Sequence, residues 1–233
     1  MEFIKEQRIQ RIRKDDTDSF TDPTVFNICK KLGIQIDQAI RIGSLGDFEL
    51  DLVIEWAKKN GWDIFSSFNF DYDTFEEFSV ELVLPIISHI GEAKTKLANA
   101  GYNGPISSVS SPDTYFIFPD LCRLAPIDFV GINAQLYFTQ RPPRDAGTFI
   151  LEEKRRVERI CDKPVKIFET GYPSAGEKFG DSVPSEENQM LVLNLILQAT
   201  DGDVTLRSLY DEVWLSPGPH RIEQHFGIFK PTY

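Results

Sequence analysis

The chain has 233 residues, of which 41% are hydrophobic, with a formal net charge of −11 and a pI near 4.8. This length and this hydrophobic content allow one sizeable core in a single domain. The acidic balance argues against a nucleic-acid groove and against an anionic membrane surface, because both need clustered Lys and Arg, and it suits a neutral substrate such as a sugar.

Short apolar or β-branched runs alternate with helical patterns along the whole chain. The predicted strands are 9–13, 34–42, 64–70, 105–110, 129–138, 165–169 and 204–214, and the predicted helices are 48–61, 86–104, 146–163 and 185–202. Strands that alternate with helices of this length indicate βαβ units and a parallel sheet. No G-x-G-x-x-G motif follows the first strand, which disfavours a dinucleotide-binding fold.

One acidic residue, Glu169, ends the predicted strand 165–169 directly before a turn at Gly171 and Pro173. In a β/α barrel the reactive residues lie at the C-terminal ends of the strands. A strand-end Glu can also cap the next helix or pair with a lysine. The position alone therefore leaves a catalytic and a structural interpretation open.

The sequence contains three cysteines, Cys29, Cys122 and Cys161, and no C-x-x-C pair. This pattern argues against a zinc ribbon or a redox motif. An odd number permits at most one disulfide within the chain, and buried free thiols are the expected state. No apolar run reaches the roughly 18 residues of a membrane span, and the N-terminus lacks the apolar run of a signal peptide, so the printed chain by itself predicts a cytoplasmic protein.

Three stretches together resemble glycoside hydrolase family 17, the endo-β-1,3-glucanases. FETGYPSAGE (168–177) resembles the nucleophile motif, FVGINAQLYF (129–138) resembles the preceding strand, and YDEVWLSPGPHRIEQHFGIF (210–229) resembles the C-terminal signature. The amino-acid sequence of these stretches is most similar to the fungal cell-wall branch of the family. The resemblance extends from about Arg11 to Phe229. The resemblance implies a (β/α)8 TIM-type barrel lacking its first βα unit, with strands 2 to 8 in one domain over residues 1–233.

The resemblance also implies a retaining mechanism, in which one carboxylate attacks the anomeric carbon and a second, protonated one donates to the leaving oxygen. In retaining enzymes the two lie about 5–5.5 Å apart. Glu169 matches the nucleophile, and no metal or cofactor is expected. The other residues that match cleft positions are Asp16, Asn133 and Tyr137 at the sixth strand end, Tyr172 after the nucleophile, and Glu212 and Trp214 at the eighth strand end.

The acid motif departs from the family pattern. Asp71-Tyr72-Asp73 stands where the family has G-N-E, so Asp73 replaces the acid and Tyr72 replaces the Asn. An aspartate is shorter by roughly 1.5 Å, and a misplacement of that order costs about a hundredfold in rate. An alignment with a two-residue gap makes Glu81 the acid instead. The ungapped alignment is preferred because it leaves 78–97 as the helix after the strand.

The N-terminal part of the chain also departs from the family pattern. Asp16 is kept, but Arg13 stands where the family has a Tyr, and the family's first strand and first helix have no counterpart. A barrel without its first unit has unpaired strand edges. Either another segment closes the gap or the sequence is truncated, and truncation is favoured. It would also explain the missing signal peptide, since the resemblance implies a secreted or cell-wall protein.

The expected function is a retaining hydrolase or transglucosylase that acts, as a monomer, on β-1,3-glucan of the fungal cell wall. Two alternatives stay open. The first is a barrel that keeps the cleft but has lost its acid, and so binds glucan without cleaving it. The second is a non-functional fragment of such an enzyme.

Overall fold

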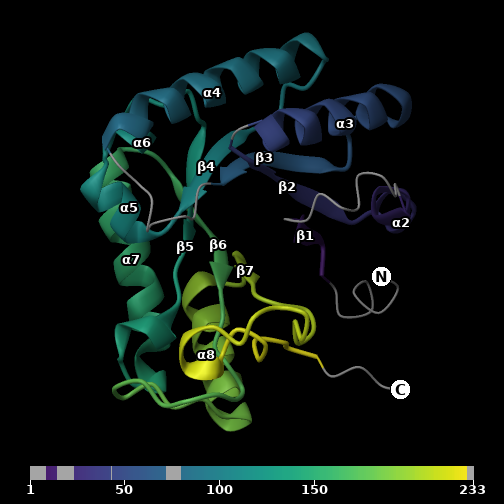
Figure 1. Cartoon of the computed structure of the whole chain (residues 1–233). Helices are drawn as coiled ribbons and strands as arrows, with labels where there is room; N and C mark the ends of the chain where they lie inside the picture. The colour runs from purple at the N-terminus through teal and green to yellow at the C-terminus, as the bar shows by residue number, and fades with distance from the viewer. Residues whose placement is uncertain (1–8, 15–23, 43, 72–79, 230–233) are drawn as a thin grey trace. The chain divides into compact units, whose positions relative to one another are not determined.

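The structure, a computed structural model, describes residues 9–14, 24–42, 44–71 and 80–229 (Figure 1). Asp16, Tyr72 and Asp73 lie outside these ranges. The described strands form one sheet in sequential order, and the four pairs whose register is resolved are parallel, which confirms the predicted α/β organisation. The strands are β1 (Arg11–Lys14), β2 (Gln35–Arg41), β3 (Phe65–Asp71), β4 (Ile106–Ser110), β5 (Phe129–Asn133), β6 (Val165–Thr170) and β7 (Val204–Leu206).

Two strands are shorter than predicted. The predicted strand 129–138 ends at Asn133, and its remaining apolar residues form the 3₁₀ helix η3 (Leu136–Thr139). The predicted strand 204–214 ends at Leu206. The apolar residues near its predicted end are solvent-exposed, with Trp214 73% exposed, so the apolar pattern there does not mark a strand.

The chain divides into two compact units. Unit 1 comprises residues 1–131 and 160–164, and unit 2 comprises 132–159 and 165–233. Unit 1 therefore contains strands β1 to β4, whereas unit 2 contains β6 and β7. No helix among the described residues has both the length and the apolar character needed to cross a bilayer.

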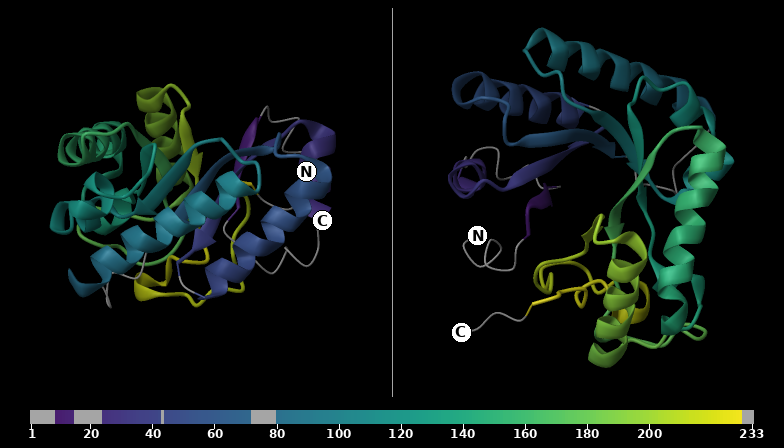
Figure 2. Two further views of the ribbon diagram at one scale, coloured as in Figure 1. Left: turned by 90° about the horizontal axis from the view of Figure 1, so that it is seen from above. Right: turned by 180° about the vertical axis from the view of Figure 1, so that it is seen from behind.

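In unit 1, helices α3 (Ser44–Asn60) and α4 (Val80–Asn99) lie side by side over strands β2 to β4 in both views, and α2 (Thr24–Leu32) lies beside β2 (Figures 1 and 2). Aromatic rings fill the space between helices and strands. Phe68 and Tyr102 have ring centroids 4.8 Å apart, in an edge-to-face arrangement that favours tight packing. The same cluster continues through Phe26, Trp56, Trp62 and Phe65.

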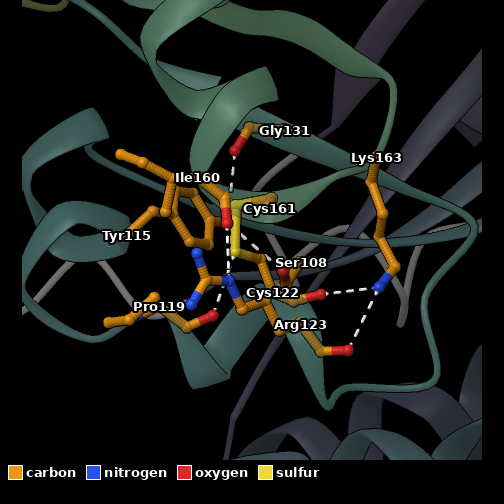
Figure 3. The surroundings of a disulfide bond; sticks show 9 residues. All are labelled: Ser108, Tyr115, Pro119, Cys122, Arg123, Gly131, Ile160, Cys161 and Lys163. Atoms are coloured by element: carbon orange, nitrogen blue, oxygen red, sulfur yellow. Dashed lines mark hydrogen bonds between the residues drawn. A yellow bond between two sulfur atoms is a disulfide. The ribbon is translucent and has the colours of Figure 1, made fainter.

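A disulfide joins Cys122 on α6 (Asp120–Arg123) to Cys161, with Cα atoms 5.4 Å apart (Figure 3). The ammonium group of Lys163 donates to the backbone carbonyl of Cys122 at 2.8 Å beside it. The prediction of free thiols is therefore wrong for this pair and holds for Cys29, which is buried and free. The cysteines of the pair are 39 residues apart in sequence, so only the folded chain brings them to bonding distance.

Unit 2 is built around α7 (Ala146–Cys161), most of which it contains, and α8 (Glu186–Thr200). Both helices match predicted ones. Ser185 caps α8, because its hydroxyl accepts a hydrogen bond from the backbone N–H of Asn188 at 3.1 Å. The helix ends at Asp201, which adopts a left-handed conformation with φ 51°.

Candidate active site

Strand β6 presents Glu169 near its carboxyl end. The neighbouring side chains of Ile167 and Phe168 are buried, whereas the side chain of Glu169 is 22% exposed. The backbone carbonyl of Glu169 accepts a hydrogen bond from the N–H of Ala134 at 2.8 Å. A rigid, hydrogen-bonded strand therefore holds a carboxylate that still reaches solvent.

Two side chains act on the same carboxylate oxygen of Glu169. The amide nitrogen Nε2 of Gln135 donates a hydrogen bond to Oε1 at 3.1 Å. The guanidinium nitrogen Nη1 of Arg207 lies 3.6 Å from Oε1, which is ion-pair distance. Gln135 follows β5 and Arg207 follows β7, so residues from both neighbouring strand ends meet at this oxygen of Glu169 on β6.

Arg207 also contacts two further carboxylates. Its Nε lies 3.3 Å from Oε2 of Glu212, and its Nη2 lies 3.1 Å from Oε2 of Glu223. Its guanidinium carbon lies 4.9 Å from the ring centre of Phe226. Burial lowers the pKa of Arg207, but Glu169, Glu223 and Glu212 more than offset it, so the pKa is raised above its ordinary value. The guanidinium therefore stays charged.

The C-terminal segment folds back on itself to bring these carboxylates together. Ser208 donates from its backbone to the carbonyl of Phe226 at 3.1 Å, and Ile228 donates to the carbonyl of Ser208 at 3.0 Å. The backbone N–H of Gly227 donates to the side chain of Asp211 at 2.9 Å. These bonds hold the loop that carries Glu212 and Glu223 against the end of β7.

The motif around Glu169 requires a glycine at position 171, because the backbone at the end of β7 passes close to it. A Cβ at this position would lie 2.5 Å from the backbone oxygen of Arg207 and 3.2 Å from the ring of Phe226. Arg207 in turn donates from its backbone to the carbonyl of Thr170 at 2.8 Å. The ends of β6 and β7 thus approach so closely that only a residue without a side chain fits between them.

Tyr137 and Tyr172, two of the cleft residues that the sequence predicts, lie inside unit 2. Both side chains are fully buried, with ring centroids 6.2 Å apart. The hydroxyl of Tyr137 donates to the backbone carbonyl of Glu177 at 2.7 Å, and burial raises the pKa of both hydroxyls. Tyr137 lies in η3 and Tyr172 follows β6, and their rings pack against each other in an edge-to-face arrangement.

The other predicted cleft residues of unit 2 have different settings. Asn133 is the last residue of β5 and is partly buried. Glu212 and Trp214 are not at a strand end, since β7 stops at Leu206. The loop returns Glu212 to Arg207 nevertheless, whereas Trp214 is 73% exposed.

The strand ends of unit 1 carry an ion pair. Arg13 on β1 pairs with Asp71, the last residue of β3, and the Arg13 side chain is only 4% exposed. Glu81, the alternative acid, lies in the first turn of α4 and is exposed. The gapped alignment placed it at a strand end, so the observed helix supports the ungapped alignment.

Neither Arg207 nor Gln135 is among the residues predicted from the sequence. The predicted strand 204–214 passes over Arg207, and only the observed end of β7 at Leu206 places Arg207 directly after a strand. Gln135 lies between Asn133 and Tyr137, two residues of the same motif that the sequence predicts as cleft residues. Within the described ranges, no group of three or more His, Cys, Asp or Glu side chains is arranged to hold a metal ion.

Comparison with known proteins matches the chain to one family. The model of the BtgE/BtgC glycoside hydrolase domain matches residues 1–227. "Probable family 17 glucosidase SCW10" of Saccharomyces cerevisiae is 34% identical over 143 residues, which cover 60% of this chain and 36% of that protein. "Cell surface mannoprotein MP65" of Candida albicans is 31% identical over 62% of this chain and 38% of its own length. The chain thus spans well under half the length of these relatives.

A solved structure shows the fold class. The glycoside hydrolase family 17 β-1,3-glucanosyltransferase of Rhizomucor miehei superposes with a TM-score of 0.78. The match covers 94% of this chain and 81% of that chain, at 22% sequence identity. The fold is therefore that of a (β/α)8 TIM-type barrel, of which the described residues supply seven strands.

Proposed function

The chain belongs to the BtgE/BtgC glycoside hydrolase domain family, and we propose that it is a retaining glycoside hydrolase or transglucosylase acting on β-1,3-glucan of the fungal cell wall. The observation that carries the proposal is Glu169. It is a partly exposed carboxylate on a rigid strand end, with an amide and a guanidinium on one of its oxygens. A nucleophile needs this combination of access, fixed orientation and stabilised charge.

In the proposed reaction, Glu169 attacks the anomeric carbon and forms a covalent glycosyl-enzyme while the bond to the leaving oxygen breaks. A protonated carboxyl supplies the proton to that oxygen, and we retain Asp73 as this acid. Water or a sugar hydroxyl then attacks the anomeric carbon, the bond from that carbon to Glu169 breaks and frees the carboxylate, and the attacking oxygen gives its proton back to the acid. Water gives hydrolysis and a glucan hydroxyl gives transfer, so both outcomes share the same first step.

The remaining substrate contacts are proposals of the same kind. Asn133 offers an amide at the strand end next to Glu169, and amide contacts to the sugar 2-hydroxyl strengthen in the transition state. The exposed ring of Trp214 offers an apolar face to a sugar ring. Asp16 and Tyr72 stay assigned to the cleft by their match to the family motifs. We assign residues 1–233 to a single barrel domain that works as a monomer.

We place the protein outside the cytoplasm, in the secretory route or the cell wall. The Cys122–Cys161 disulfide supports this, because such bonds persist mainly in oxidising compartments. The name of the Candida albicans relative, a cell surface mannoprotein, points the same way.

A second function, glucan binding without cleavage, is favoured by one observation. Asp71 stands at the end of β3, where the family motif begins, and pairs with Arg13. The salt bridge engages the Asp71 side chain with a guanidinium that is only 4% exposed, so we do not assign the acid role to Asp71. The acid role then depends on Asp73 alone, and without it the barrel would hold glucan intact.

One experiment separates nucleophile from acid. A 2-deoxy-2-fluoro β-glucoside with an activated leaving group labels a nucleophile without needing a general acid, whereas a linear β-1,3-gluco-oligosaccharide needs both. We expect wild-type protein to gain one fluoroglucosyl unit on the peptide that contains Glu169, and Glu169→Gln to gain none. Glu187→Gln, an exposed carboxylate on α8, is the matched control.

The oligosaccharide then reports on the acid. Labelling together with oligosaccharide cleavage supports the enzyme, and Asp73→Glu should increase cleavage without changing the labelling rate. Labelling without cleavage supports the glucan-binding alternative. Labelling of a residue other than Glu169 would contradict the assignment of the nucleophile.

A further inference from the structure

Arg207 is held by more groups than its ion pair with Glu169 requires. Its Nε and Nη2 contact Glu212 and Glu223 at 3.3 and 3.1 Å, both shorter than the 3.6 Å from Nη1 to Glu169. Its guanidinium lies over the ring of Phe226. Because the guanidinium is planar, contacts through three nitrogens and one face determine its orientation completely.

The charges in this cluster depend on Arg207. Glu169, Glu212 and Glu223 contribute three negative charges against the single positive charge of Arg207. All four side chains are between 21% and 25% exposed, so water screens them only in part. Without the arginine, three carboxylates at close range would disfavour the ionised form of one another. An unionised Glu169 is not a nucleophile.

The longer contact to Glu169 suits a nucleophile. A short bidentate ion pair would bind the attacking lone pairs tightly. Here the hydrogen bond to Oε1 comes from the uncharged amide of Gln135 at 3.1 Å, and the guanidinium acts from 3.6 Å. The amide orients the carboxylate, and the arginine stabilises its charge.

Attack on the sugar removes the negative charge of Glu169. If Glu169 were the sole partner of the arginine, the positive charge of the arginine would then be left without compensation. Arg207 keeps Glu212 and Glu223 after Glu169 has become an ester. The cluster therefore tolerates both the ionised and the glycosylated state of Glu169.

We propose that Arg207 is a positioning residue for Glu169, anchored by Glu212 and Glu223, which keeps the nucleophile ionised and oriented before attack and stays paired afterwards. This inference rests on the proposed function of Glu169. In unit 2, Arg207 pairs with Glu169, Glu212 and Glu223, and Gln135 donates a hydrogen bond to Glu169.

The test compares three variants. Arg207→Gln removes the charge, and Arg207→Lys retains it. Arg141→Gln is the control, because Arg141 also pairs with two carboxylates, Asp145 and Glu152, and lies 5.9 Å from a phenylalanine ring. The fluoroglucoside labelling rate is measured from pH 4 to 8, at intervals of about half a unit.

We expect Arg207→Gln to label about 10 to 100 times more slowly at neutral pH, with the acidic limb of its pH profile moved upward by about one unit. Arg207→Lys should recover the position of the limb, and Arg141→Gln should match the wild type. An Arg207→Gln profile superimposable on that of the wild type would overturn the inference.

A second readout does not depend on activity. Proteins carrying ¹³C in the glutamate carboxyl groups are titrated by NMR, and the signal lost in Glu169→Gln identifies Glu169. Its titration should move to higher pH in Arg207→Gln and to lower pH in Glu223→Gln, which removes a negative charge but keeps a hydrogen-bond acceptor. Glu223→Gln also serves if Arg207→Gln fails to fold. Identical titrations would refute the role of Arg207, whereas wild-type protein that is never labelled would refute the proposed function instead.

Discussion

Substitution of Gly171 by alanine tests how closely the ends of β6 and β7 determine the site. The new Cβ would lie 2.5 Å from the backbone oxygen of Arg207, and ordinary contacts begin at 3.4 Å, so the two chain segments must separate by about 0.9 Å. The obstacle is the backbone oxygen of Arg207. It cannot rotate away, because the backbone N–H of the same residue is hydrogen-bonded to the carbonyl of Thr170. Overpacking of this kind costs roughly 1–3 kcal/mol.

The same displacement moves the Arg207 guanidinium relative to Glu169. A shift near 1 Å in a catalytic array costs about a hundredfold in rate. We therefore expect Gly171→Ala to lower both the free energy of unfolding, measured in urea, and the fluoroglucoside labelling rate. Gly91→Ala is the control. Gly91 lies in helix α4, and a Cβ there would contact a ring carbon of Pro126 at 3.8 Å, which is an ordinary van der Waals distance. Unchanged stability and labelling in Gly171→Ala would show that the strand ends are not packed as described.

Four further predictions concern the cysteines and a buried tyrosine. Replacing Cys122 and Cys161 by Ala should lower the free energy of unfolding in urea by up to about 4 kcal/mol, because the disulfide closes a loop over a 39-residue separation. A thiol reductant should destabilise the wild type and leave the double variant unchanged. A double variant as stable as the wild type would refute this prediction. Burial raises the pKa of Cys29 to about 11, so iodoacetamide at pH 8 should modify it only after unfolding, as seen by mass spectrometry; rapid reaction of folded protein would contradict its burial. The same shift means that the unfolded thiol ionises first, so stability should fall as the pH rises from about 9 to 11. Tyr137→Phe leaves the Glu177 carbonyl without its 2.7 Å hydrogen bond and should cost about 1 kcal/mol in urea unfolding, with labelling kinetics unchanged; a raised KM would instead restore Tyr137 to the substrate cleft.

The order of strands and helices could be predicted from the sequence because it depends on local patterns. Runs such as 64–70 and 105–110 are apolar over a strand length and are bounded by turn residues, and each became a strand within one residue of its predicted bounds. The prediction failed where side chains past a strand end are apolar for other reasons. In 204–214 the run continues into a loop whose form depends on hydrogen bonds to residues near Phe226.

The sequence by itself also determined where Glu169 lies, since an acidic residue that closes an apolar strand is visible without any partner. Its surroundings were decided by the tertiary structure alone. Gln135 is 34 residues from Glu169, and Arg207 is 16 residues from Glu223, separations that no local periodicity encodes. The same holds for the burial of Tyr137 and for the disulfide of Cys122. Parallel strands bring such residues together only after the crossovers between them have folded, so the contacts that adjust a carboxylate's charge and orientation belong to the fold.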